Sequence, residues 1–179
     1  RAKAMTATTP LAQQYEVVAK VDSRPDPATG EYTIGDAPSL AHLPDGGLLC
    51  AAPLITRPRG QGVLRFHRSD DGGRTWRRLP AESAFHCGRL IPQGEALYFV
   101  GAGPTRGEGI RIIRSDDMGE SWSEPVELFA GGFYNAASGY VVRDGRLYWC
   151  FGSVNEAGSF NAAGSRTVVI AADFERDLT

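Results

Sequence analysis

Two copies of one acidic octapeptide constrain the fold of this chain more than any other feature of its 179 residues. SDDGGRTW occupies residues 69–76, and SDDMGESW occupies residues 115–122. Their flanks match as well, since RFHR precedes the first copy and RIIR precedes the second. The offset of 46 residues (115 − 69) indicates a repeated structural unit, because a period of ~40–50 residues is typical of the blades of a β-propeller.

Three hairpin patterns support this interpretation. Each consists of two short apolar runs joined by a turn that contains Gly, and Gly accepts the positive φ that tight hairpin turns require. The hairpins span residues 39–54, 88–103 and 138–153, and third strands are expected at 63–68, 109–114 and 166–171. Fourth strands are expected to begin at Trp76 and Trp122. We therefore predict an all-β fold, a β-propeller of four-stranded antiparallel blades with about three blades present.

The expected domain organisation follows from these repeats. Residues 1–31 form an N-terminal arm, in which the alternating stretch 15–21 is a candidate for a ring-closing strand. Residues 32–179 form a partial propeller with blades at 32–79, 80–128 and 129–179. Three blades leave apolar faces uncovered, so we expect the remaining blades to come from a missing C-terminal part or from self-association.

The acidic octapeptide itself is interpreted as a structural turn. Asp71 and Asp117 are expected to accept backbone N–H groups, with help from the serine two residues earlier. Gly73 and Gly119 are expected to adopt a conformation that is costly for other residues. The closing tryptophan then folds back as the apolar plug of its own blade and buries on the order of 200 Å².

Composition excludes several classes of function. With 42% hydrophobic residues, 22% charged residues and a net charge of −2, the chain is predicted to be globular and to bind neither nucleic acid nor a membrane. The spacing of the three cysteines is not that of a zinc site, so we expect buried thiols, no metal and no cofactor. If Met5 is the native start, we expect a cytoplasmic protein; the alternative is a secreted or periplasmic protein whose signal has been removed.

The pattern Ser-x-Asp-x-Gly-x-Thr/Ser-Trp, present twice, closely resembles the Asp-box (BNR) repeat of the sialidase superfamily. The resemblance covers roughly residues 32–179 and implies a six-bladed propeller when the ring is complete. Many members of that family are exo-glycosidases, so the resemblance also implies a carbohydrate-active enzyme. Substrates of sialidase-like propellers bind near the axis, on the face opposite the Asp-box turns.

The loops expected on that face carry an unusually polar set of side chains. Asp36 and His86 are the candidates for proton transfer, because hydrolysis needs an acid and a base and a histidine titrates near neutral pH. The candidates for substrate binding are Arg57, Arg59, Arg106, Tyr134, Asn135, Asn155 and Glu156.

This sequence departs from the sialidase pattern at two positions. Asp36 stands where the family has an arginine before the first inner strand, and the loop 56–62 lacks the expected aspartate. We therefore expect an exo-glycosidase that acts on a terminal sugar other than sialic acid, with a glycan or oligosaccharide as its partner. Two alternatives remain: a non-catalytic propeller that binds a glycan or a protein, and a polysaccharide lyase.

Overall fold

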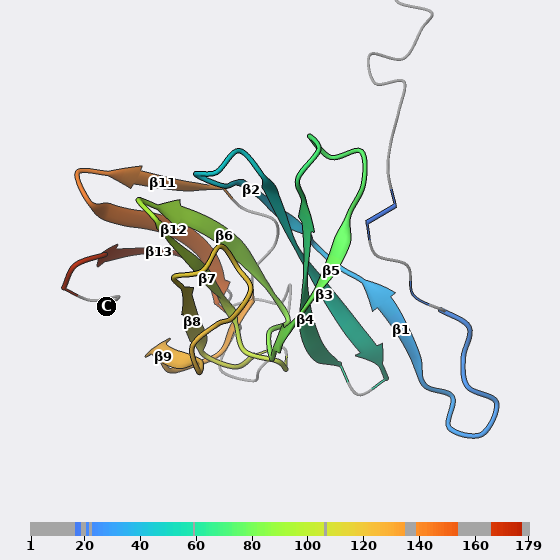
Figure 1. Cartoon of the computed structure of the whole chain (residues 1–179). Coiled ribbons are helices and arrows are strands. Elements are labelled where there is room, and N and C mark those ends of the chain that lie inside the picture. The colour runs from blue at the N-terminus through green and yellow to red at the C-terminus, as the bar shows by residue number, and fades with distance from the viewer. Residues whose placement is uncertain are drawn as a thin grey trace, which may run out of the picture.

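The computed structural model describes residues 17–18, 21, 23–58, 60–105, 107–134, 139–153 and 166–176. Every regular element in this part of the chain is a β-strand (Figure 1). The strands form three antiparallel sheets that follow one another along the sequence. The predicted all-β fold is therefore confirmed.

The first sheet contains five strands and has the order β1-β3-β4-β5, with β2 also paired to β3. Its strands are β1 (Tyr32–Gly35), β2 (Ser39–His42), β3 (Leu48–Arg57), β4 (Gln61–Ser69) and β5 (Arg77–Ser83). Both β1 and β2 lie along the same edge of β3, because Ser39 pairs with Ala51 and Gly35 pairs with Leu54. They therefore act as one inner strand that is interrupted at residues 36–38.

The second and third sheets repeat this meander. The second sheet contains β6 (Cys87–Gln93), β7 (Ala96–Ala102), β8 (Ile110–Ser115) and β9 (Val126–Phe129) in sequential order. The third contains β10 (Phe133–Tyr134), β11 (Tyr140–Arg143), β12 (Arg146–Ser153) and β13 (Arg166–Asp173), and β10, β11 and β13 all pair with β12. β1 and β10 lie outside the strands predicted from the sequence, and β9 begins four residues after Trp122.

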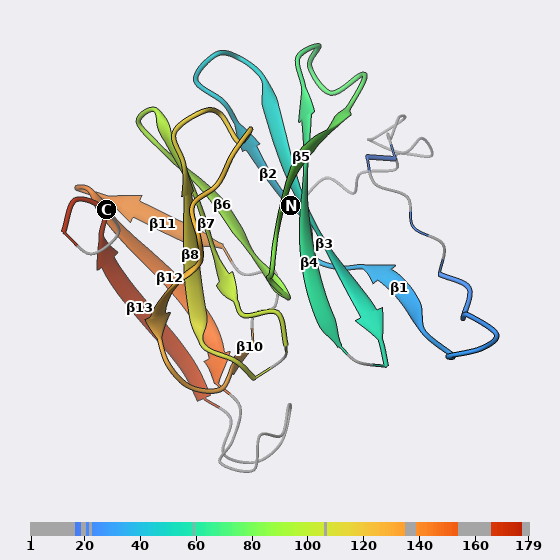
Figure 2. The same cartoon turned by 60° about the horizontal axis from the view of Figure 1, so that its bottom comes forward.

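The three sheets stand side by side, and an apolar core fills each of the two spaces between them (Figure 2). Strand alternation sends successive side chains to opposite faces, so the second sheet contributes to both cores, whereas the first and third sheets each contribute to one. Between the first and second sheets, Phe66 and Phe85 both contact Phe99 edge to face. Between the second and third sheets, Trp149 is 1% exposed and Tyr98 packs on Phe174 at 5.1 Å between ring centroids.

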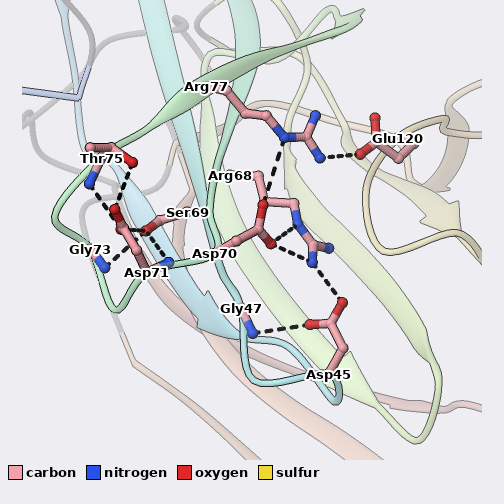
Figure 3. Close-up of polar contacts among 10 residues, drawn as sticks. All are labelled: Asp45, Gly47, Arg68, Ser69, Asp70, Asp71, Gly73, Thr75, Arg77 and Glu120. Carbon is pink, nitrogen blue, oxygen red and sulfur yellow. Dashed lines mark hydrogen bonds and ion pairs between the residues drawn. The ribbon is translucent and has the colours of Figure 1, made fainter.

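The two acidic turns have the predicted hydrogen bonds. Oδ1 of Asp71 accepts the backbone N–H groups of Arg74 and Thr75, both at 2.9 Å, and the Ser69 hydroxyl donates to the same oxygen at 2.9 Å (Figure 3). Gly73 has a φ of 88° and donates its N–H to Ser69 Oγ. The second turn repeats this arrangement around its own aspartate. The octapeptide therefore satisfies its own polar groups, as expected of a structural turn.

The role predicted for the tryptophan is wrong in one respect. The indole of Trp122 stacks on Phe66 of the preceding sheet, with ring centroids 4.5 Å apart and an interplanar angle of 14°. Gly119 lies against the same sheet, because a Cβ on it would approach Leu49 Cδ2 to 2.8 Å. The second acidic turn thus plugs the junction between two blades and not the interior of its own blade.

Charged side chains add a second set of contacts around the first turn. Arg68 donates to Asp45 in the β2–β3 turn at 2.6 Å and to Asp70 at 2.7 Å (Figure 3). Arg77 donates to Glu120 in the second acidic turn at 2.5 Å and so bridges the two sheets. These arginines belong to the repeated scaffold and lie at the end of the sheets that carries the acidic turns.

The prediction of three buried thiols holds for two cysteines. Cys50 and Cys87 are buried, whereas Cys150 is exposed. The difference follows from strand alternation, because Cys150 points to the outer face of the third sheet and its neighbour Trp149 points into the core.

Candidate functional site

The candidate site lies at the end of the sheets opposite the acidic turns. The hairpins β2–β3 and β6–β7 share one end with the two acidic turns, and the connections β3–β4 and β7–β8 lie at the other (Figure 2). The chain enters the inner strand of each sheet at this second end. Asp36 precedes β2 and His86 precedes β6, so both lie there.

Asp36 is fixed by backbone contacts in the interruption between β1 and β2. Its N–H donates to the carbonyl of Pro53 on β3 at 2.9 Å, which continues the strand pairing. Its carboxylate Oδ1 accepts the N–H of Ala37 at 2.8 Å. The side chain remains 40% exposed, so the other carboxylate oxygen can reach a ligand.

His86 belongs to the second sheet and is held equally firmly. Its N–H is shared between the carbonyl groups of Ala102 and Gly103, at 3.2 and 3.1 Å. The side chain is only 5% exposed, and its Nε2 lies 4.0 Å from Oδ2 of Asp36. The structure therefore brings together the two residues that the sequence singled out for proton transfer, although 50 positions separate them.

This geometry gives the two groups different chemical capacities. The exposed carboxylate of Asp36 can touch a bound molecule directly, whereas the buried imidazole of His86 is shielded from it. At 4.0 Å the pair is within ion-pairing range but beyond a hydrogen bond.

Backbone hydrogen bonds connect the loops at this end of the three sheets. Gly62 at the start of β4 donates its N–H to the carbonyl of Pro104 at 2.7 Å. Gly107 donates to the carbonyl of Phe133, and Phe133 donates to that of Glu108. The site is thus carried by linked segments of neighbouring sheets.

The structure does not bring the other described candidates to the pair. Arg57 lies at the far end of β3, paired with Tyr32, four residues beyond the Pro53 that contacts Asp36. Four residues of strand correspond to about 13 Å. Tyr134 lies on β10, one sheet beyond His86. The remaining predicted binding residues lie outside the described residues; they are Arg59, Arg106, Asn135, Asn155 and Glu156.

Sequence reasoning missed Arg89, an arginine of the innermost strand of the second sheet. It lies three residues after His86 and donates Nη1–H to the carbonyl of Gly88 at 2.8 Å. Burial lowers the pKa of its guanidinium. Arg89 lies inside the predicted hairpin 88–103 and not in a loop, and the signal that could have found it is a charged residue within an inner strand.

A hollow of about 600 Å³ is lined in part by Asp36. Its lining includes Cys50, Ala52 and Leu54 of β3 and Val17 of the N-terminal arm. This face of β3 corresponds to the faces of β7 and β12 that pack on the preceding sheet. We therefore assign the hollow to the packing of the first sheet and restrict the candidate site to the pair of Asp36 and His86.

Metal-binding clusters and membrane-spanning helices are both absent from the described part of the chain. None of its His, Cys, Asp and Glu side chains form a group of three or more that could hold a metal ion. None of its segments is a helix of the length and apolar character needed to cross a membrane.

No family model and no curated protein matches the chain. Solved structures do match it. An α-L-arabinanase of Penicillium chrysogenum complexed with arabinobiose has a TM-score of 0.57 and 17% sequence identity, over 78% of this chain and 46% of that chain. A sialidase of Trypanosoma rangeli in complex with the inhibitor DANA has a TM-score of 0.55 and 18% identity, over 74% of this chain and 23% of that one.

At these identities the likeness establishes the fold alone. The chain spans less than half of the length of either solved structure. Their shared architecture, the all-β sheets and the inter-sheet cores lead to one conclusion: the chain has a β-propeller fold, which it shares with part of the arabinanase and part of the sialidase.

Proposed function

We propose that this chain is part of a glycoside hydrolase that removes a terminal sugar, with Asp36 as the group that exchanges a proton with the glycosidic oxygen. The observation that carries the proposal is the approach of His86 Nε2 to Asp36 Oδ2 at 4.0 Å, from two different sheets, at the end of the blades away from the acidic turns. Hydrolysis requires an acid and a base or nucleophile on either side of the bond. The second group is expected from another blade.

The sugar is expected to lack a carboxylate. Asp36 stands where a sialidase carries an arginine, so the cation that would attract the carboxylate of sialic acid is missing at this position. Arg57, the nearest predicted candidate for a carboxylate clamp on the same sheet, lies about 13 Å along β3 from the contact of Asp36. The arabinanase with the same fold is solved with the neutral disaccharide arabinobiose, so neutral pentosides belong in the substrate panel.

The proposal is tested by hydrolysis of aryl glycosides by the full-length protein. The panel contains neutral hexosides, α-L-arabinofuranosides and a sialoside. Asp36→Asn removes the proton-exchanging carboxyl at constant size and is expected to reduce kcat about 100-fold or more on the substrate that is cleaved. Glu95→Gln, in the exposed β6–β7 turn, is the matched control and should retain full activity. Full activity in Asp36→Asn would overturn the proposal.

The same assay addresses the two alternatives. A lyase would cleave polymers of uronic acids and release an unsaturated product that absorbs ultraviolet light. Hydrolysis releases no such product. A non-catalytic propeller would bind glycans, detected by calorimetry, without turning over any member of the panel.

A further inference from the structure

We propose that Gly62 is a positioning residue that sets the separation between Asp36 and His86. The inference rests on the pair used in the proposed function, but it concerns how the fold holds that pair and not the reaction it performs. Gly62 lies on β4 of the first sheet, far in the sequence from either residue. Because Gly62 has no side chain, the backbone of the second sheet can approach β4 closely at this position.

The backbone that enters the second sheet occupies the place of a side chain at Gly62. A Cβ on Gly62 would lie 2.1 Å from the carbonyl oxygen of Phe85 and 2.6 Å from Cα of His86. Both are backbone atoms, so neither can rotate away as the end of a flexible side chain could. Even the smallest side chain would therefore push the segment that carries His86 away from β4 by roughly 1 Å.

Hydrogen bonds on both sides make this contact a spacer between the two residues of the pair. Gly62 is paired with Ile55, and Ile55 is paired with Ile34 on β1, two residues before Asp36. On the other side, the N–H of His86 is held by Ala102 and Gly103. A shift at the Gly62 contact is thus transmitted to the distance between the carboxylate and the imidazole.

The segment has a second anchor in Phe85, the residue before His86. Its ring is fully buried and meets Phe99 edge to face, with centroids 5.0 Å apart. Phe85 therefore anchors the backbone of His86 through its ring in the apolar core. Gly62 determines how closely the two sheets approach each other. A change at either residue should alter the pair without removing either reactive group.

The test is the coupling between the two groups, measured by NMR without any substrate. The midpoint of the His86 proton titration is compared between the wild type and Asp36→Asn, because a nearby carboxylate favours the charged imidazole. The resulting difference is the coupling. In the background of Gly62→Ala, the same comparison is expected to give a clearly smaller difference, since the charge interaction weakens with distance.

Gly35→Ala is the matched control. Gly35 precedes Asp36 directly and its φ is not in the left-handed region. Apart from its two chain neighbours, no described residue has an atom within 4 Å of the added Cβ. Its coupling should equal that of the wild type. A folded Gly62→Ala protein with undiminished coupling would overturn the proposal. Should that variant not fold, Phe85→Leu takes its place, and an undiminished coupling there overturns the proposal equally.

Turnover supplies an independent second measurement. If a substrate is cleaved, Gly62→Ala is expected to lower kcat about 10- to 100-fold with little change in KM, because a displacement of about 1 Å impairs the reactive geometry more than binding. If Gly62→Ala reduces the coupling but the protein cleaves no glycoside, the positioning role of Gly62 stands and only the proposed glycosidase activity is overturned. Turnover with unchanged coupling would defeat only the spacer.

Discussion

Asp71 shows what a single carboxylate contributes to the acidic turn. Hydrogen bonds from the backbone and side chain of Thr75, with those from Ser69 and Arg74, hold the pKa of Asp71 at about 2. Its folded-state pKa lies below the ordinary value of 3.8. The stability that these bonds provide is therefore fully present above about pH 4 and is lost as the pH falls towards 2.

We accordingly expect Asp71→Asn to be less stable than the wild type at pH 7, and the gap to close as the pH falls from about 4 towards 2. Urea unfolding at a series of pH values measures the gap. Glu95→Gln, at an exposed turn, is the control and should follow the wild type throughout. A gap that does not depend on pH would show that the charge of Asp71 plays no part in the turn.

His67 is expected to act in the same direction at higher pH. It is 6% exposed on the outer face of the first sheet, and its Nδ1 has no hydrogen-bond partner among the described residues. Burial lowers the pKa of His67, and the charges of Arg78 and Arg65 lower it further. His67 therefore binds a proton more readily in the unfolded chain than in the folded chain. The free energy of unfolding falls as the pH drops below about 6.5.

His67→Leu removes this proton linkage. Ile113 occupies the corresponding position on β8, two residues before the serine of the turn, and is fully buried. As the pH is lowered from 7 to 5, the free energy of unfolding of His67→Leu should therefore rise relative to that of the wild type. Urea titrations of both proteins at both pH values measure this difference. An equal difference at the two pH values would contradict the linkage.

Among the elements, the two acidic turns have the same sequence pattern but not the same packing. Trp122 stacks on Phe66 of the preceding sheet, whereas no ring contact of Trp76 is found among the described residues. Both indoles donate Nε1–H to the glycine carbonyl three residues earlier. The difference between them is therefore the inter-sheet contact alone.

We expect Trp122→Ala to lower the free energy of unfolding by about 3 kcal/mol, because the removal of a large aromatic side chain creates a cavity between two sheets. Trp76→Ala is the matched comparison and should cost clearly less. Chemical denaturation followed by circular dichroism measures both. Equal losses would mean that the turn, and not the junction, is what the tryptophan stabilises.

The same turns show what the sequence could and could not predict. The repeat gave the strands, the turn hydrogen bonds and the correct end of the sheets for Asp36 and His86, because all of these depend on local patterns. Which blade receives Trp122 depends on how neighbouring sheets pack, and the octapeptide contains no information on that. The contact of Gly62 with Phe85 was invisible for the same reason, and Arg89 was missed because it lies within a strand.

At the scale of the whole molecule, the register of the repeats identifies one uncovered face. Ile112 on β8 pairs with Val100, and Val169 on β13 pairs with Cys150, so the two side chains occupy corresponding places on successive sheets. Ile112 is 6% exposed, because the third sheet covers it, whereas Val169 is 65% exposed. Tyr148 and Val141 of the same face are also exposed.

This contrast makes a paired prediction for the 179-residue chain. Ile112→Thr places a hydroxyl in the core between two sheets and should cost about 2–4 kcal/mol of stability. Val169→Thr makes the same chemical change at the corresponding position and should stay within about 0.5 kcal/mol, because its surroundings are already water. It should also reduce self-association in light scattering, since a contiguous apolar face favours aggregation. If Val169→Thr costs as much as Ile112→Thr, the third sheet is covered in solution, and the uncovered face inferred from the register does not exist.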